Sequence, residues 1–253
     1  MTNTPTSEKK FVLNSPNNRK LGTGIHSFSL PAGPASCPGR TKVCSSVCYA
    51  QRGFFSFPAM HRTLAAAMKQ TKAKNFVART VEEIHRRGIR VVRIHVAGDF
   101  YLHKGKNPDQ YIRRWIEIIK SCPNVKFFGY TRSWRIQKLV PALRALAKLP
   151  NMVLWLSCDR DAPKPVRIAH TRVAYMLSDP DGEQSIPSTS NLVFRTMDRH
   201  LVRKKIDGVQ VCPVENGIKL DSPVTCTTCK LCWDSSTPVL TQLSLAGRAQ
   251  QTT

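Results

Sequence analysis

The stretch VVRIHV at residues 91–96, followed by AGDF at residues 97–100, is the part of the chain that decides the fold. Its β-branched residues predict a buried strand, and the glycine directly after it predicts a tight turn. Two further apolar runs, VKFFGY at residues 125–130 and MVLWLS at residues 152–157, predict two more strands. The segments between successive runs are long enough for one helix and its turns. The near-continuous apolar character of the last run is typical of a parallel strand covered on both faces.

The flanking segments extend this alternation. Apolar side chains recur at helical spacing along residues 108–120. Similar patterns predict helices over residues 58–87, with a break at residues 72–75, and around residues 141–149. Further strands are expected at residues 11–13, 25–30, 173–177, 192–195 and 209–212. We therefore expect an α/β fold, namely a parallel (β/α) barrel of the TIM type, complete or partial, with a doubly wound open sheet as the alternative.

The charge is large and unevenly spread. The 253 residues carry a formal net charge of +23, with 39 Lys and Arg against 16 Asp and Glu. Because residues 206–253 hold slightly more acidic than basic residues, the excess lies in the preceding part of the chain. A field of this strength favours nucleic acid or another polyanion as partner, and the alternative is a solvated basic surface. The expected organisation is a polar arm (1–24), a barrel (25–205) and a cysteine-rich segment (206–253).

Several classes are excluded by the sequence. Its apolar runs are too short for a membrane-spanning helix, and its first residues lack the apolar centre of a secretory signal. We therefore expect a cytoplasmic protein. The chain contains no phosphate-cradling glycine loop, no G-x-S-x-G turn and no H-E-x-x-H helix. Its 9 cysteines, an odd number, favour metal ligands over a disulfide framework.

The first cysteine group is a C-x6-C-x3-C loop, residues 37–48, made by Cys37, Cys44 and Cys48 directly after a predicted strand. Three thiolates on one loop can hold three irons of a [4Fe–4S] cluster and leave the fourth iron open for a ligand. The alternatives are three reduced thiols without a metal, or a zinc site completed by a histidine such as His26 or His61.

The second group is a C-x13-C-x2-C-x2-C pattern made by Cys212, Cys226, Cys229 and Cys232. Closely spaced thiolates of this kind turn around one metal centre, and four of them leave no open position. We expect a closed [4Fe–4S] cluster here, with zinc as the alternative. Cys122 lies before a proline at the end of a predicted helix and is expected to be a buried free thiol.

Other candidate residues follow the predicted strands, where barrels carry their functional side chains. Asp99, Arg132 and Cys158 are the catalytic candidates, and Cys158 either reaches the open iron, lines the pocket or simply packs. Arginines gathered at one edge suit a phosphate or carboxylate, unless each pairs with a neighbouring acid. The substrate-binding candidates are Tyr130, Arg132, Asp159, Arg160 and Arg195.

The cysteine loop, ending in Cys48-Tyr49-Ala50, resembles the cluster loop of radical SAM enzymes, most closely the spore photoproduct lyase-like branch. The resemblance implies a radical SAM-type barrel, a [4Fe–4S] cluster on the three cysteines, and S-adenosylmethionine chelating the open iron. It also implies that Gly98 and Asp99, in the turn after the second strand, bind the methionine part of this cofactor. The spacing departs from the C-x3-C-x2-C that is usual in that family.

A second resemblance covers most of the chain. Residues 30–50, 95–100, 130–133 and 225–233 are similar to the "gene product 88" family of phages and plasmids, which implies a mobile-element origin but no reaction. Together these features predict a radical-SAM-like iron–sulfur enzyme that acts on nucleic acid, a nucleotide or another anion and receives electrons from flavodoxin or ferredoxin. The alternatives are a non-enzymatic nucleic-acid-binding protein with structural metal sites, and a redox sensor.

Overall fold

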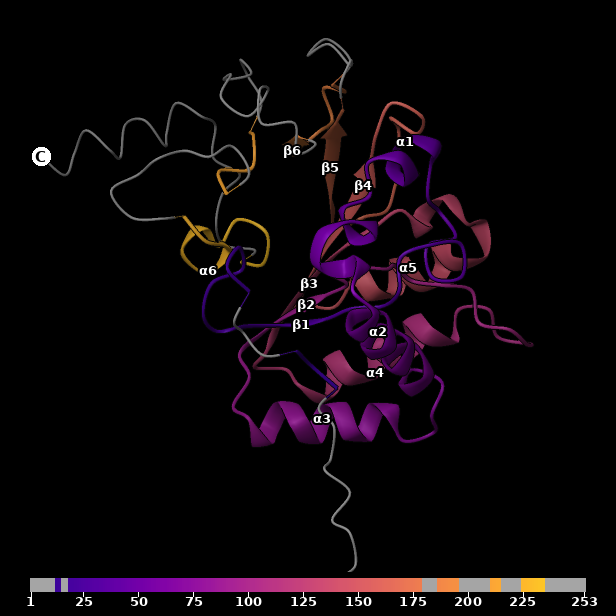
Figure 1. The fold of residues 1–253 in the computed structure, drawn as a ribbon, viewed down its shortest axis with the longest axis vertical. Helices are drawn as coiled ribbons and strands as arrows, with labels where there is room; N and C mark the ends of the chain where they lie inside the picture. The colour runs from indigo at the N-terminus through magenta and orange to yellow at the C-terminus, as the bar shows by residue number, and fades with distance from the viewer. Residues whose placement is uncertain (1–11, 15–17, 179–185, 196–209, 215–223, 235–253) are drawn as a thin grey trace, which may run out of the picture.

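Six parallel strands form one sheet that curls into a half-barrel (Figure 1). The computed structural model describes residues 12–14, 18–178, 186–195, 210–214 and 224–234. The strands are β1 (Ile25–Phe28), β2 (Val91–Ile94), β3 (Lys126–Thr131), β4 (Met152–Cys158), β5 (Thr171–Leu177) and β6 (Leu192–Arg195). Each pairs with the next one along the chain, so the order is β1-β2-β3-β4-β5-β6. A doubly wound sheet reverses its strand order, so that alternative is wrong for these strands. The α/β class is confirmed, and the curled parallel sheet agrees with a partial barrel.

The helices are α1 (Lys42–Ser46), α2 (Pro58–Gln70), α3 (Phe76–Arg86), α4 (Gln110–Ser121), α5 (Val140–Ala147) and α6 (Cys226–Cys229), with short 3-10 turns η1 (Tyr49–Gln51), η2 (Gly53–Ser56), η3 (Ser133–Arg135) and η4 (Gln137–Leu139). Four helices agree with the predicted pattern, namely α2 to α5, whereas α1 and α6 were not predicted. The break predicted at residues 72–75 is confirmed, since it separates α2 from α3. None of the helices in the described residues is long and apolar enough to cross a membrane.

Four predicted strands are shorter than expected, and the first of them, expected at residues 25–30, ends at Phe28. The run at residues 91–96 ends at Ile94 because His95 adopts a left-handed backbone conformation with φ of 62°. Of residues 209–212, only Val211 forms a parallel bridge, to Val193, and residue 209 lies outside the described residues. At the N-terminal end, the pairing is a single antiparallel bridge at Asn14 rather than a strand over residues 11–13, of which residue 11 is not described.

The two faces of the sheet have different covers. Side chains alternate along each strand, so Phe28, Ile94 and Leu154 face a core that helices α3, α4 and α5 complete. Phe128 and Trp155 face the opposite, concave side, where the described part of the C-terminal segment packs against them. Figure 1 shows α6 across the sheet from α2 and α4. The described part of the cysteine-rich segment, residues 210–214 and 224–234, therefore covers the inner face of the half-barrel.

Candidate metal centres

The first cysteine loop lies over the carboxyl ends of β2 and β3. Its entry is fixed where the amide of Leu30 donates to the carbonyl of Ala97 at 2.8 Å, and its exit where the Tyr49 hydroxyl donates to the carbonyl of Val96. Between them the backbone of Gly39 packs so tightly on the Arg132 carbonyl that a Cβ there would overlap it. The loop is thus held at the edge where parallel β/α domains carry their chemistry.

Helix α1, inside the loop, is anchored to the end of β4 by two aspartates. Thr41 caps the helix by accepting from the amide of Cys44 at 2.9 Å, and its hydroxyl donates to Oδ2 of Asp159 at 2.6 Å. The amide of Val43 donates to Oδ2 of Asp161 at 3.0 Å. Because Thr41 and Asp159 are both buried, the hydrogen bond between them is shielded from water, whereas Asp161 is exposed.

Arg132 connects the same anchor to the thiols. Its guanidinium forms an ion pair with Oδ2 of Asp159 at 2.7 Å, and both side chains are nearly inaccessible to solvent. Burial raises the pKa of the Cys44 thiol, while the charge and a hydrogen bond from Arg132 lower it. Arg132 therefore pairs with a neighbouring acid, which is the alternative that the sequence left open to anion binding. The same guanidinium favours the thiolate form of Cys44.

Asp99 lies beneath the loop and ties β2 to β3. Its Oδ1 accepts from the Thr131 hydroxyl at 2.6 Å and from the Phe100 amide at 2.7 Å, and its Oδ2 accepts from the Arg132 amide at 2.8 Å. Burial raises the pKa of Asp99 to about 6, although these hydrogen bonds lower it. Burial, and then the charge of Asp99, raise the pKa of Cys37 to about 11. Asp99, which the sequence predicted as a site residue, therefore lies close to Cys37.

The donor set of this loop fits a metal or cluster in its chemistry. Cys37, Cys44 and Cys48 are free thiols of intermediate exposure, and Cys44 interacts electrostatically with both of the others. Within the described part of the chain, no three Cys, His, Asp or Glu side chains already have their donor atoms gathered around one point. Metal binding therefore requires side-chain rotation and the release of thiol protons.

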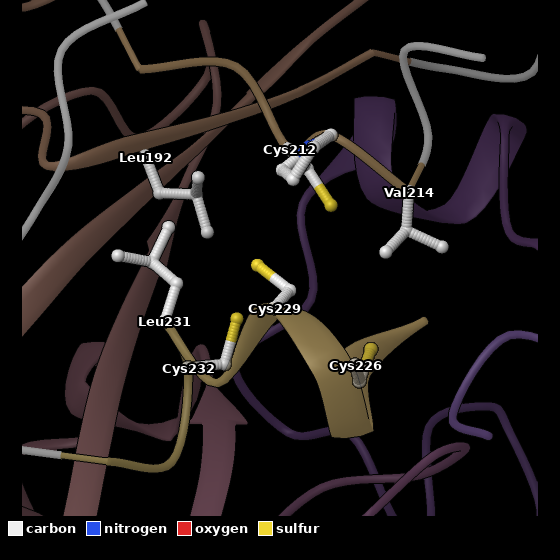
Figure 2. A pocket seen from close by; sticks show the side chains of 8 residues that line it. Leu192, Cys212, Val214, Cys226, Cys229, Leu231 and Cys232 are labelled. Atoms are coloured by element: carbon white, nitrogen blue, oxygen red, sulfur yellow. The ribbon is translucent and has the colours of Figure 1, made fainter. Parts of the chain in front are cut away.

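The second cysteine group lines a cavity against the concave face of the sheet. Figure 2 shows Cys212 on one wall and Cys229 and Cys232 on the facing wall, with Leu192 and Leu231 beside them. The cavity also touches Cys226, so all four sulfur-bearing residues line it. Its volume is about 10 Å³, the space of roughly one water molecule. The four thiols therefore face one small shared space, and binding of any metal there requires their side chains to turn towards one point.

Backbone carbonyls fasten this group to the sheet. The indole of Trp155 donates to the carbonyl of Cys232 at 3.0 Å, and Arg172 donates to that of Leu231 at 2.9 Å. The amide of Thr227 donates to the carbonyl of Leu21 at 3.0 Å, ahead of β1. The second group is thus attached to the concave face and to the residues that lead into β1, apart from the carboxyl edge that carries the first.

Arg93 is a partly buried cation of the concave face. Its guanidinium lies over the ring of Tyr130, 5.5 Å from the centroid, and its Nε has no hydrogen-bond partner among the described residues. Burial lowers the pKa of Arg93, but the charges of Tyr49 and Tyr130, and then of Cys226 and Cys232, raise it, so that its net shift is upward. A four-thiolate metal centre carries negative charge, so Arg93 is placed to compensate it.

The remaining candidates have mixed placements. Cys158 is fully buried in the helix-facing core, and burial raises its pKa to about 12. Tyr130 is on the concave face, stacked on Trp155 with ring centroids 5.7 Å apart. Arg195 is buried at the end of β6, whereas Arg160 is exposed. The structure thus joins Arg132 to Asp159 but distributes the other substrate-binding candidates over different environments.

Three further expectations concern single residues. Cys122 is a buried free thiol, as predicted. Gly98 has a left-handed φ of 80° and packs against Leu30, so its turn needs glycine whatever it binds. His26, one of the histidines considered for a zinc site, interacts electrostatically with Glu83 in helix α3 and with Arg87 at the end of that helix.

The sequence reasoning missed the residues that anchor the loop. Thr41 precedes a short helix and is a favoured cap residue, so its role was readable. Gly39, Asp161 and Arg135, which donates to the carbonyls of Gly39 and Arg40 at 2.9 Å, gave no comparable signal. Their roles depend on contacts between distant parts of the chain.

Comparison with known proteins identifies the family. Residues 3–235 match the family model described as "Gene product 88". The chain belongs to the gene product 88 family. The "Gene 88 protein" of Mycobacterium phage L5 is 29% identical over 174 residues, covering 59% of this chain and 69% of the phage protein. That of Mycobacterium phage D29 is 28% identical over 174 residues, covering 59% and 68%.

These matches confirm the resemblance to the gene product 88 family, and both relatives are phage proteins. No solved structure matches the chain. The comparisons therefore name no reaction for the gene product 88 family, and they do not support the radical SAM resemblance.

Proposed function

We propose that the protein is a radical-SAM-like iron–sulfur enzyme whose open [4Fe–4S] cluster is held by Cys37, Cys44 and Cys48. One observation carries this proposal: three free thiols lie on one loop that Thr41 and Asp159 anchor to the carboxyl edge of a parallel half-barrel. Three protein ligands leave one iron available to a further ligand. A cluster held there supplies single electrons and an open coordination position.

The residues of the chain have separate tasks in this proposal. Arg132 favours the thiolate form of Cys44 and is held in place by its ion pair with Asp159. The turn at Gly98 and Asp99 binds the methionine part of S-adenosylmethionine beside the loop. Asp99 keeps this turn rigid through its three hydrogen bonds to the ends of β2 and β3.

The second cysteine group forms a closed centre in this proposal. Cys212, Cys226, Cys229 and Cys232 supply four thiolates and leave no position open, so the centre relays electrons or fastens the C-terminal segment across the concave face. Arg93 compensates its charge. The substrate is an anion, with nucleic acid or a nucleotide favoured by the net charge of +23, and flavodoxin or ferredoxin is the reductant.

The test is cleavage of S-adenosylmethionine by the anaerobically prepared full-length protein after reduction with dithionite. We expect release of methionine from the wild type and none from the Cys44→Ala variant. The Cys122→Ala variant is the matched control, because this thiol is buried in the helix-facing core. Absence of methionine from a protein that holds its iron would overturn the radical-SAM-like reaction.

A second candidate is a nucleic-acid-binding protein whose metals are structural. The specific observation in its favour is that all four C-terminal cysteines line one small cavity, and four cysteines are a common ligand set of structural zinc. This candidate expects zinc with little iron, and nucleic-acid affinity that falls steeply with salt. Redox-active iron at the first group would count against it.

A further inference from the structure

A cluster of exposed aromatic rings directly follows the third cysteine of the first loop. Tyr49, Phe54 and Phe57 are 45%, 65% and 57% exposed, and Leu102 is the one other large hydrophobic side chain among the described residues that is exposed. Phe55 joins the rings into one group. Its ring centroid lies 5.9 Å from that of Tyr49 and 6.4 Å from that of Phe54, which in turn lies 6.0 Å from that of Phe57.

This aromatic cluster is not a folding core. Its rings meet edge to face, at interplanar angles of 68° to 82°, and leave much of their surface in water. Turns η1 and η2 present them, and helix α2 begins directly after Phe57. Grouped exposed apolar side chains in a soluble domain mark a binding surface.

The charge of the chain segment that carries the cluster indicates the class of partner. Between Glu8 and Glu82 the sequence contains no acidic residue. Lys42, Arg52 and Arg62 lie near the rings in sequence, and all three are exposed. A second copy of the chain would bring like charges together at this surface, whereas a polyanion complements it. Aromatic rings with a basic surround are the arrangement that binds unpaired bases and their phosphates.

We propose that Tyr49, Phe54 and Phe57 stack on the bases of a single-stranded nucleic acid and bring it beside the first cysteine loop. The strand must be single because the faces of paired bases are covered by their neighbours in a duplex. This inference rests on the proposed function in one respect, the polyanionic substrate. It adds the form of the nucleic acid and the surface that receives it.

The test is fluorescence anisotropy with a labelled oligothymidylate, measured over a series of salt concentrations with the full-length protein. Each stacked ring contributes at least about a 5-fold gain in affinity, so Phe54→Ala/Phe57→Ala is expected to weaken binding by about 25-fold or more at every salt concentration. The slope of log affinity against log salt stays unchanged in this variant. Arg62→Gln is expected to reduce that slope by about 0.7.

The matched control is Leu102→Ala, which removes an exposed apolar side chain outside the cluster and is expected to bind like the wild type. If the wild type binds no oligothymidylate, the single-stranded substrate is wrong, and the cleavage of S-adenosylmethionine still decides the proposed reaction separately. If the wild type binds and the double variant binds equally well, only the stacking surface is wrong. A wild-type dimer that becomes a monomer in the double variant would assign the cluster to self-association and overturn the inference.

Discussion

Thr41→Val removes two hydrogen bonds at the point where the first cysteine loop meets the sheet. The Thr41 hydroxyl accepts from the Cys44 amide at 2.9 Å and donates to the Asp159 carboxylate at 2.6 Å. Valine has nearly the same shape, so the substitution removes the polar contacts without opening a large cavity. Thr41 is 5% exposed, so water does not readily replace what is lost.

The structure sets the size of the effect. Loss of a helix cap lowers stability by about 1 kcal/mol, and loss of a hydrogen bond to a charged group lowers it by about 1.5 to 3 kcal/mol. Asp159 keeps its ion pair with Arg132, so no buried carboxylate is left without a cation. We expect the free energy of unfolding to fall by about 3 kcal/mol and Tm by about 6 to 12 °C.

Two measurements check this prediction. Urea or thermal unfolding reports the global loss of stability, and the rate at which a thiol reagent labels Cys44 and Cys48 reports local opening of the loop. Thr41→Ser keeps both hydrogen bonds and is expected to remain close to the wild type. The reasoning is refuted if Thr41→Val unfolds within about 0.5 kcal/mol of the wild type with unchanged labelling, or if the serine variant is equally destabilised.

Three further substitutions test other parts of the account. Gly39→Ala places a methyl group against the Arg132 carbonyl and is expected to lower stability by about 1 to 3 kcal/mol with faster thiol labelling; unchanged labelling would contradict the docking of the loop. Arg93→Gln removes the cation beside the second cysteine group, and metal affinity there is expected to fall by about 10- to 100-fold in a chelator competition, whereas equal retention would count against charge compensation. His95 has its pKa lowered to about 3, first by burial, so the folded protein holds it neutral while the unfolded chain binds a proton below about 6.5. The free energy of unfolding of the wild type therefore falls by at most about 5 kcal/mol as pH decreases from 6.5 towards 3. Asparagine tolerates the φ of 62°, so His95→Asn is expected to show a weaker dependence of this free energy on pH in urea titrations. The same pH dependence in both proteins would refute the prediction.

The parallel strands and main helices were predictable from the sequence because each has a local cause. The period of the apolar residues gave α4, and the polar break at residues 72–75 separated α2 from α3. The end of β2 was not predictable, because the left-handed conformation at His95 depends on its burial beside Tyr111, with which its Nε2 forms a hydrogen bond at 2.7 Å.

The candidate site was predictable in its composition but not in its connections. Cysteine spacing alone separated the two groups, and the carboxyl ends of the strands indicated Asp99 and Arg132. The bond from Thr41 to Asp159 joins residues 118 positions apart, which no local pattern encodes. Arg93 did leave a signal, since a charged residue within an apolar strand needs a partner on the face towards which it points.

The central claim is that each cysteine group binds its own metal centre, and iron, sulfide and zinc per chain after anaerobic purification test it most directly. The wild type is expected to contain at least about four irons and four sulfides that are lost when Cys37, Cys44 and Cys48 are replaced by alanine. Metal at the second group is expected to remain in that variant and to be lost on replacement of Cys226 and Cys229. A wild-type protein without iron, or iron that is unaffected by loss of the first three cysteines, would contradict the account.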